Sequence, residues 1–314
     1  MKIKKLLCLL LAGTMILPLV AACAANTSPE NNPTEKPTDL PTDPQKPTEP
    51  TDPTDPVEEV IVALPKDKHY SILFIGNSYT KRYSMPTEIF EPMAKAAGYD
   101  VEVTAILNGG HTLLGFADPN DEFGAQVAAA LAPENAGKYD YVVIQEQSLR
   151  PIVDTDKFYD GVRALTEKIR AVGATPVLYS HWGRKTGSPD LINMSLTNES
   201  MTWKLAAVAE AIGKELDIPV AYVGLAFFDI YTNEPGIEIY DEDLYHPIYP
   251  GSYLAAATIF AKIFGVDPTT VYYAGDLVDA SAIVALPIAA KNAVFNTPEI
   301  PEKYKTSSEG VTSE

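Results

Sequence analysis

Five short apolar runs alternate with longer amphipathic stretches along most of the chain. These runs are the predicted strands, at residues 70–76, 101–107, 139–145, 175–181 and 218–224. Most of them are almost continuously apolar, which is typical of strands whose two faces are both covered by helices. The alternation of strands and helices therefore predicts a parallel sheet with right-handed crossovers and helices on both sides.

Two of the stretches between these runs carry apolar residues at the spacing of one helix face. The first set is Phe158, Val162, Leu165, Ile169 and Val172. The second set is Met201, Leu205, Val208, Ile212 and Leu216. A further helix is predicted at residues 252–264. Residues 279–295 also have a helical pattern, but Pro287 lies among them, so we expect a kink or two short helices there.

The N-terminus has the layout of a secretory signal peptide at residues 1–22, with lysines followed by an apolar run and small residues. The run is too short for a permanent membrane span. Its end, VAAC at residues 20–23, resembles a bacterial lipobox, which implies cleavage before Cys23 and a lipid on the sulfur of that residue. The alternative is an ordinary signal peptide with an incidental cysteine. The other cysteine, Cys8, lies inside the signal, so the exported chain is expected to form no internal disulfide.

Residues 23–62 are predicted to be a linker between this anchor and a folded domain. Proline recurs there among Thr, Asp and Glu, which leaves no apolar face to bury and favours extended, solvated conformations. We interpret the segment as a semi-rigid stalk; a disordered leader without a spacing role is the alternative. Residues 63–296 are then long enough for one domain with a full core, and residues 297–314 are predicted to be a disordered tail.

Polar residues follow each predicted strand. The segments are Asn77-Ser78, Asn108-Gly109-Gly110-His111, Gln145-Glu146-Gln147-Ser148, His181-Trp182, and a long loop that contains Asp243 and His246. Ligands of open parallel sheets bind at the carboxyl ends of the strands, which all lie at one edge. The sequence therefore predicts a functional site at that edge.

A serine nucleophile needs a base, and the base needs an orienting group. The chain has four histidines, and His69 precedes the first strand, at the wrong edge. Of the others, His246 alone has an acid at a fixed short spacing, since Asp243 stands three residues before it. In a turn, that spacing lets the carboxylate accept from one ring nitrogen while the other faces Ser78. The alternative is an exposed acidic loop without a role.

These residues carry a resemblance to the SGNH (GDSL-like) hydrolase family. "FIGNSYT" resembles its first block, with Asn77 where Asp is commoner, and "LNGGHTL" is similar to its second block. "VVIQEQS" occupies the position of the third block, and "DLYHP" with "GSYLAA" resembles the fifth. The resemblance spans the predicted domain. It implies a three-layer α/β/α sandwich with a five-stranded parallel sheet of flavodoxin-like order. The chain lacks the Gly-x-Ser-x-Gly elbow, which argues against an ordinary α/β-hydrolase.

The resemblance implies a catalytic triad of Ser78, Asp243 and His246. It also implies an oxyanion hole made by the N–H groups of Ser78 and Gly110 and by a side-chain amide of the third block. Register assigns that amide to Gln147. The family usually has Gly-x-Asn-Asp in this block, so which of residues 145–147 faces the oxyanion stays open.

Four further residues are candidate substrate contacts. Asn77 and His111 stand beside the expected nucleophile and oxyanion glycine, and His181 with Trp182 is placed to line a sugar subsite. The alternative for His181 and Trp182 is loop packing, and for His111 a solvated turn. No cofactor or metal is expected, since the acidic run at residues 241–243 lacks regular calcium-ligand spacing.

The sequence thus predicts a serine esterase, most plausibly a deacetylase of an extracellular carbohydrate, anchored by lipid to the outer face of a bacterial membrane. The expected partner is an acylated small molecule or glycan, and the membrane is contacted through the lipid alone. The formal net charge of -18 argues against nucleic acid. The alternative function is a surface lipoprotein that binds a solute or glycan without turning it over.

Overall fold

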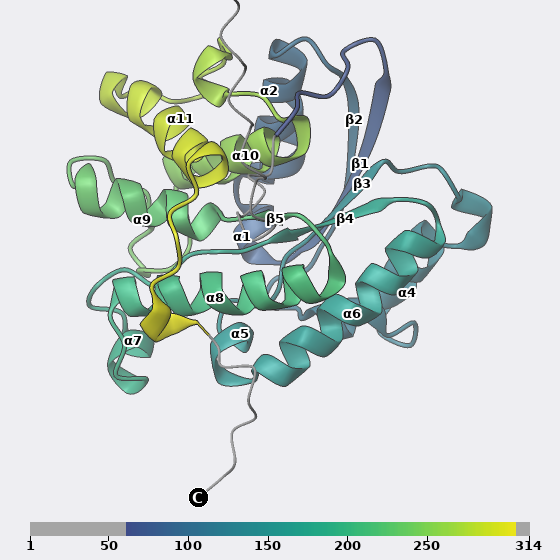
Figure 1. Cartoon of the computed structure of the whole chain (residues 1–314), viewed down its shortest axis with the longest axis horizontal. Helices are drawn as coiled ribbons and strands as arrows, with labels where there is room; N and C mark the ends of the chain where they lie inside the picture. Colours follow the sequence, from purple (N-terminus) through teal and green to yellow (C-terminus); the bar gives the residue numbers. More distant parts are fainter. Residues whose placement is uncertain (1–60, 306–314) are drawn as a thin grey trace, which may run out of the picture. The chain divides into compact units, whose positions relative to one another are not determined.

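A five-stranded sheet with helices on both faces forms the centre of the structure (Figure 1). The structure is a computed structural model that describes residues 61–305. The predicted signal peptide, the lipid-bearing Cys23 and nearly all of the predicted linker lie outside the described residues. None of the described helices is both long and apolar enough to cross a membrane.

The sheet is entirely parallel, and its strand order is β2-β1-β3-β4-β5. The strands are β1 His69–Gly76, β2 Asp100–Leu107, β3 Tyr141–Ile144, β4 Thr175–Tyr179 and β5 Val220–Ala221. All five predicted strands are therefore confirmed, with β5 shorter than expected. The order is the flavodoxin-like one, so the predicted α/β/α fold class is confirmed.

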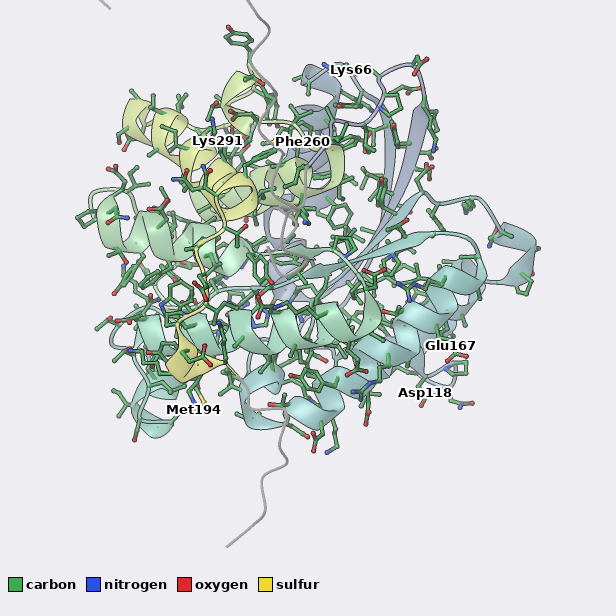
Figure 2. All side chains as sticks on the ribbon, viewed as in Figure 1. Lys66, Asp118, Glu167, Met194, Phe260 and Lys291 are labelled. Atoms are coloured by element: carbon green, nitrogen blue, oxygen red, sulfur yellow. The ribbon has the colours of Figure 1, made fainter. Side chains whose placement is uncertain are left out.

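Helices cover each face of the sheet and bury a separate apolar cluster there. On one side lie α2 Glu91–Ala96, α9 Val223–Asn233, α10 Tyr249–Phe264 and α11 Ala280–Phe295. On the other lie α3 Leu113–Ala117, α4 Glu122–Ala130, α6 Thr155–Ala171 and α8 Asn198–Leu216. The short helices α1 Ser78–Lys81, α5 Arg150–Val153 and α7 Pro189–Asn193 follow strand ends or loops. Phe260 is buried within α10, whereas Glu167 on α6 lies at the surface (Figure 2).

The helix predictions are confirmed for α6, α8 and α10, each of which begins slightly before its apolar pattern. In α8 the early start has a clear cause, because Thr197 caps the helix in a capping box with Ser200. The prediction for residues 279–295 is partly wrong, since α11 is one helix and not two short ones. Pro287 lies inside it and is buried, so packing offsets the hydrogen bond that proline removes.

The C-terminal boundary of the domain lies later than predicted. Residues 297–305 were expected to belong to a disordered tail, but Ile300 is 4% exposed and joins the apolar cluster of α9, α10 and α11. A short 3-10 helix follows at Glu302–Tyr304. Tyr304 packs against the same cluster, so these residues lie on the domain.

Candidate functional site

The loop after β1 presents Ser78 at the carboxyl edge of the sheet. β1 ends at Gly76, where an added Cβ would lie 2.7 Å from the hydroxyl oxygen of Thr80, so only glycine fits. Asn77 then caps α1, because its side-chain oxygen accepts the N–H of Tyr79. Ser78 is therefore the first residue of α1, with its side chain at the end of a buried strand.

Ser78, His246 and Asp243 form one chain of hydrogen bonds. His246 Nε2 lies 2.8 Å from Ser78 Oγ, and His246 Nδ1 lies 2.6 Å from Asp243 Oδ2. The structure thus brings together the three residues that the sequence assigned to a triad. Their spacing lets His246 accept a proton from the hydroxyl while its other nitrogen donates to the carboxylate.

The turn that carries Asp243 and His246 is held by its own backbone. Asp243 Oδ1 accepts the N–H groups of Tyr245 at 3.1 Å and His246 at 2.9 Å. Burial raises the pKa of Asp243, but these hydrogen bonds and the His246 ring outweigh it, so the pKa is lower than usual. Leu244 between them has φ 69°, a left-handed conformation that is costly for a branched side chain.

An aromatic stack lies beneath this turn. The ring of Trp182 stacks between Tyr79, at 4.4 Å, and Phe227, at 3.8 Å. Its indole N–H donates to the carbonyl of Tyr245 at 3.0 Å, which ties the stack to the turn. Trp182 is 0% exposed, so the predicted role in a sugar subsite is wrong and the packing alternative holds.

His181 is also buried and turned away from solvent. Its Nε2 lies 2.9 Å from the carbonyl oxygen of Ser148, and burial lowers the pKa of His181 to about 4. The ring is therefore neutral at ordinary pH and joins the loop after β4 to the loop after β3. This residue too follows the packing alternative instead of contacting substrate.

Asn77 and Gln145 hold the nucleophile segment from within. Asn77 is buried, its side-chain amide donates to the carbonyl of His111 at 3.3 Å, and its backbone N–H donates to Gln145 Oε1 at 3.1 Å. Gln145 Oε1 also accepts the hydroxyl of Thr80. The predicted substrate contact of Asn77 is thus wrong, because both polar groups of its side chain are used internally.

The side chain of Gln147 is placed differently from that of Gln145. β3 ends at Ile144, so strand alternation does not extend to Gln147. Its Oε1 accepts the N–H groups of Leu149 and Arg150, each at 2.9 Å, and so begins the turn into α5. The amide nitrogen has no hydrogen-bond acceptor among residues 61–305, so the assignment of Gln147 as an oxyanion donor stays a prediction.

Two backbone N–H groups that follow β1 and β2 at the carboxyl edge of the sheet have no acceptor in the described part of the chain. In the first turn of α1, the N–H groups of Tyr79, Thr80 and Lys81 are all accepted by Asn77, and that of Ser78 is not. The N–H of Gly110 is likewise unpaired, and Gly110 has φ 70°. They are the two backbone groups that the resemblance implies as oxyanion donors, and that role stays a prediction.

His111 is partly buried in the second loop. Its ring packs against Phe116, with centroids 4.5 Å apart, and its Nε2 lies 3.0 Å from Asp121 Oδ1. The pKa of Asp121 is lower than usual, mainly because its carboxylate accepts the backbone N–H groups of Gly124 and Phe123. Burial opposes this effect, and the neighbouring His111 adds to it. The solvated-turn alternative is therefore wrong, and a role as substrate contact stays a prediction.

Sequence reasoning missed two charged residues beside the site. Arg184 is buried and donates to the hydroxyls of Tyr79 and Ser148, and Arg82 lies 3.0 Å from Asp241 and 3.8 Å from the carboxylate of Asp243. Neither arginine directly follows a predicted strand, so the sequence contains no signal for them. Glu146, one of the three residues left open in the third block, is a buried carboxyl group after β3.

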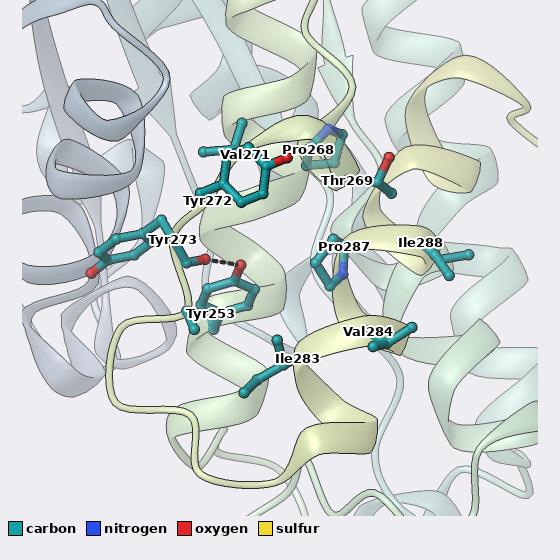
Figure 3. A pocket seen from close by; sticks show the side chains of 11 residues that line it. Tyr253, Pro268, Thr269, Val271, Tyr272, Tyr273, Ile283, Val284, Pro287 and Ile288 are labelled. Carbon is teal, nitrogen blue, oxygen red and sulfur yellow. Dashed lines mark hydrogen bonds between the residues drawn. The ribbon is translucent and has the colours of Figure 1, made fainter. Parts of the chain in front are cut away.

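A cavity beside α10 and α11 lies apart from the hydrogen-bond chain. Its volume is about 490 Å³, and Tyr253, Tyr273, Pro287 and Ile288 are among the residues that line it (Figure 3). No cluster of His, Cys, Asp or Glu suited to a metal ion occurs within the described residues.

No protein-family model matches the chain, and no curated protein matches it significantly. Among solved structures, it is similar to a candidate SGNH hydrolase from Slackia heliotrinireducens, with 29% identity, a TM-score of 0.53, and coverage of 62% of this chain and 99% of that one. It also resembles a DUF4886 family protein from Bacteroides uniformis, with 20% identity, a TM-score of 0.58, and coverage of 75% and 98%. The second likeness concerns the fold alone. The first supports a hydrolase on an SGNH-type fold.

Proposed function

We propose that this chain is a serine ester hydrolase, with Ser78 as nucleophile, His246 as general base and Asp243 as the group that orients the histidine. The hydrogen-bond chain of these three side chains, at 2.8 and 2.6 Å, is the observation that carries the proposal. The unpaired backbone N–H groups of Ser78 and Gly110 support it, since acyl transfer needs donors for a developing oxyanion.

In the first half of the reaction, Ser78 Oγ attacks the ester carbonyl carbon while His246 Nε2 takes the hydroxyl proton. Asp243 accepts from Nδ1–H and stabilises the imidazolium. The N–H groups of Ser78 and Gly110 and the side-chain amide of Gln147 donate to the oxyanion. The tetrahedral intermediate collapses, and the departing alcohol takes the proton from Nε2. Water then attacks the acyl-serine by the same route and releases the acid.

We propose an O-acetyl group on an extracellular carbohydrate as the substrate, as the resemblance to the family implies. One feature of the surface supports a sugar. Tyr83, which is 44% exposed, follows α1, and its ring packs edge-on against Tyr249, with centroids 5.6 Å apart. Tyr249 stands three residues after His246. An exposed tyrosine beside both catalytic segments offers an apolar ring face and a hydroxyl, which suit a pyranose.

The test is hydrolysis of p-nitrophenyl acetate by the soluble domain, with Ser78→Ala as the control, followed by acetate release from a panel of acetylated polysaccharides. We expect turnover by the native protein and almost none by the variant. Equal rates for both would favour the alternative, a surface protein that binds its ligand without hydrolysing it.

The proposed location is the outer face of a bacterial membrane, reached through a lipid on Cys23. The VAAC sequence supports it, together with the absence of any other cysteine after the signal peptide. A two-chain diacylglycerol anchor would hold the protein firmly. Mass spectrometry of the mature N-terminus tests this, and a free thiol at Cys23 or cleavage elsewhere would refute it.

A further inference from the structure

Glu146 is a buried carboxyl group at the site to which the proposed chemistry gives no role. It is 1% exposed, and its Oε2 has no hydrogen-bond partner in the described part of the chain. Burial of such a group is costly unless hydrogen bonds or an opposite charge compensate it. The contacts of its other oxygen indicate what it does.

Glu146 Oε1 connects two loops of the site. It accepts the backbone N–H of Leu113 at 3.2 Å and that of Gln147 at 2.6 Å. Leu113 begins α3 three residues after Gly110, the proposed backbone donor. Gln147 is the proposed side-chain donor. One oxygen atom therefore joins the segments that carry both of these oxyanion donors.

The Gly110 loop is held at its base and not at its tip. An added Cβ at Gly109 or Gly110 would meet no atom within 4 Å, so the tip of the loop is not packed. It is held on one side by the hydrogen bond from Asn77 to the His111 carbonyl, and on the other by the bond between Leu113 and Glu146. The His111 ring, beside Phe116 and Asp121, and the backbone bond from Asn108 to Gly76 also hold the base of the loop. Glu146 is the anchor at the end of the loop where α3 begins.

We propose that Glu146 is a positioning residue for the oxyanion hole, and that its carboxylate form holds the Gly110 loop more firmly than its acid form. This inference rests on the proposed ester hydrolysis. Its physical basis is that an N–H bonded to a charged oxygen makes a stronger hydrogen bond than one bonded to a neutral oxygen.

The charge of Glu146 changes close to neutral pH. Burial raises its pKa to about 7, against the opposing effects of the hydrogen bonds from Gln147 and Leu113 and of the Arg150 charge. His181 and Tyr179 line the same cavity of about 10 Å³, which is room for about one water molecule. Burial lowers the pKa of His181 to about 4 and raises that of Tyr179 well above its usual value, so both stay neutral while Glu146 titrates.

The experiment is the pH profile of kcat and KM on one ester for the native protein, Glu146→Gln and Ser78→Ala. Glutamine has the same shape and keeps an oxygen acceptor, but it cannot ionise. We expect the native kcat to rise through a step near pH 7, in addition to the step of the general base. The height of this step should be about five- to ten-fold, the difference between a charge-assisted and a neutral hydrogen bond. Glu146→Gln should lose this step, so that its kcat stays at the lower value of the native step across the pH range, while its KM is unchanged.

The outcomes separate the two proposals. A native profile without the additional step, or a step that persists in Glu146→Gln, overturns the role of Glu146 and leaves the hydrolase standing. Turnover by Ser78→Ala at the native rate overturns the hydrolase itself. Should Glu146→Gln fail to fold, amide hydrogen exchange of the native protein decides. We expect the N–H groups of Leu113 and Gln147 to lose protection relative to those of the core strands, which follow the stability of the whole domain, when the pH falls from 8.5 to 5.5, after correction for intrinsic rates. Unchanged protection would refute the inference.

Discussion

The two segments that meet in the Ser78–His246–Asp243 chain are held in different ways. The nucleophile segment continues a buried central strand, and Asn77 is bonded at both its backbone and its side chain. The turn at residues 241–246 continues no strand of the sheet, and the side chain of Asp243 is 33% exposed. It is held by its own backbone, by Trp182 and by a backbone bond from Lys185 to Leu244.

This difference separates a rigid end of the site from an end that depends on few contacts. Segments with many buried contacts open only with the whole domain, whereas exposed turns open at lower free energy. Changes in the nucleophile segment should therefore reduce both stability and activity, whereas changes in the histidine turn should reduce activity mainly. The predictions below test this separation.

The largest effect is expected from the hydrogen-bond chain itself. Ser78→Ala or His246→Ala should lower kcat on the order of 10⁵- to 10⁶-fold, and Asp243→Asn on the order of 10⁴-fold, as for other triads. Because the groups act as a unit, the double variant Ser78→Ala/His246→Ala should be little worse than either single one. Steady-state kinetics measure this, and a double variant with multiplied losses would contradict it.

The next effect concerns the two glutamines after β3. Removal of an oxyanion donor typically costs on the order of a hundred- to a thousand-fold in kcat, so Gln147→Ala should lose about that much with KM nearly unchanged. Gln147→Glu is the matched control, since it keeps the oxygen that accepts from Leu149 and Arg150 but has no N–H to donate. Full activity of Gln147→Glu would limit Gln147 to its capping role.

Gln145→Ala should instead act on stability and orientation, because Gln145 supports Asn77 and Thr80 from within. Urea unfolding and kinetics on the same preparations distinguish the two glutamines. If Gln145→Ala is as stable as the native protein but loses more kcat than Gln147→Ala, the oxyanion donor is Gln145 instead.

Two buried groups make stability depend on pH in opposite directions. Glu146 has a folded pKa of about 7, above its ordinary 4.5, so its stabilising contribution is complete below about pH 4.5 and is lost as pH rises through 7. That difference corresponds to ~3 kcal/mol. His181 has a folded pKa of about 4, below its ordinary 6.5, so its contribution is present above pH 6.5 and is lost as pH falls towards 4.

As the pH rises from 5 to 8, the stability of Glu146→Gln should therefore increase relative to that of the native protein. The expected gain is up to ~3 kcal/mol, measured as the change in the free energy of unfolding in urea at both pH values. The native protein at each pH is the control. An equal difference between variant and native at pH 5 and at pH 8 would show that Glu146 titrates normally in the fold.

A smaller effect is expected where the aromatic stack meets the histidine turn. Trp182→Phe keeps most of the apolar contact with Tyr79 and Phe227 but removes the hydrogen bond to the Tyr245 carbonyl. The loss of one buried hydrogen bond should cost about 1 kcal/mol of stability. If the turn depends on this contact, kcat falls by more than the change in stability explains. Thermal unfolding and kinetics measure both quantities. An unchanged kcat would show that the position of the turn does not depend on Trp182.

The smallest effect is expected from Arg82→Ala. Arg82 is partly exposed and lies between Asp241 and Asp243, and exposed ion pairs contribute about 0–1 kcal/mol. We expect less than about a five-fold loss of kcat, reduced further at high salt because exposed charges are screened. Arg82→Lys is the matched control that keeps the charge. A loss as large as that of Asp243→Asn would place Arg82 in the catalytic machinery.

Much of the architecture follows from patterns that the sequence contains. Apolar runs bounded by polar residues specify strands, and parallel strands must end at one edge, so the positions of Ser78 and of the loop with Gly110 follow from chain order. The pairing of Asp243 with His246 is equally local, because the two residues stand three positions apart in one turn. These features depend on period and spacing, which a single chain displays.

The direction of side chains beyond the strand ends was decided by tertiary contacts. Asn77, His181 and Trp182 turn inward because their partners, the carbonyls of His111, Ser148 and Tyr245, come from loops distant in sequence. The alternation that would have aimed the glutamines stops with β3. Hydrogen bonds take its place, from the distant N–H of Asn77 for Gln145 and from the adjoining turn for Gln147. Which polar groups face the substrate, and which only hold the loops, is therefore a property of the assembled fold, since the free energy of each buried polar group depends on the partner it finds there.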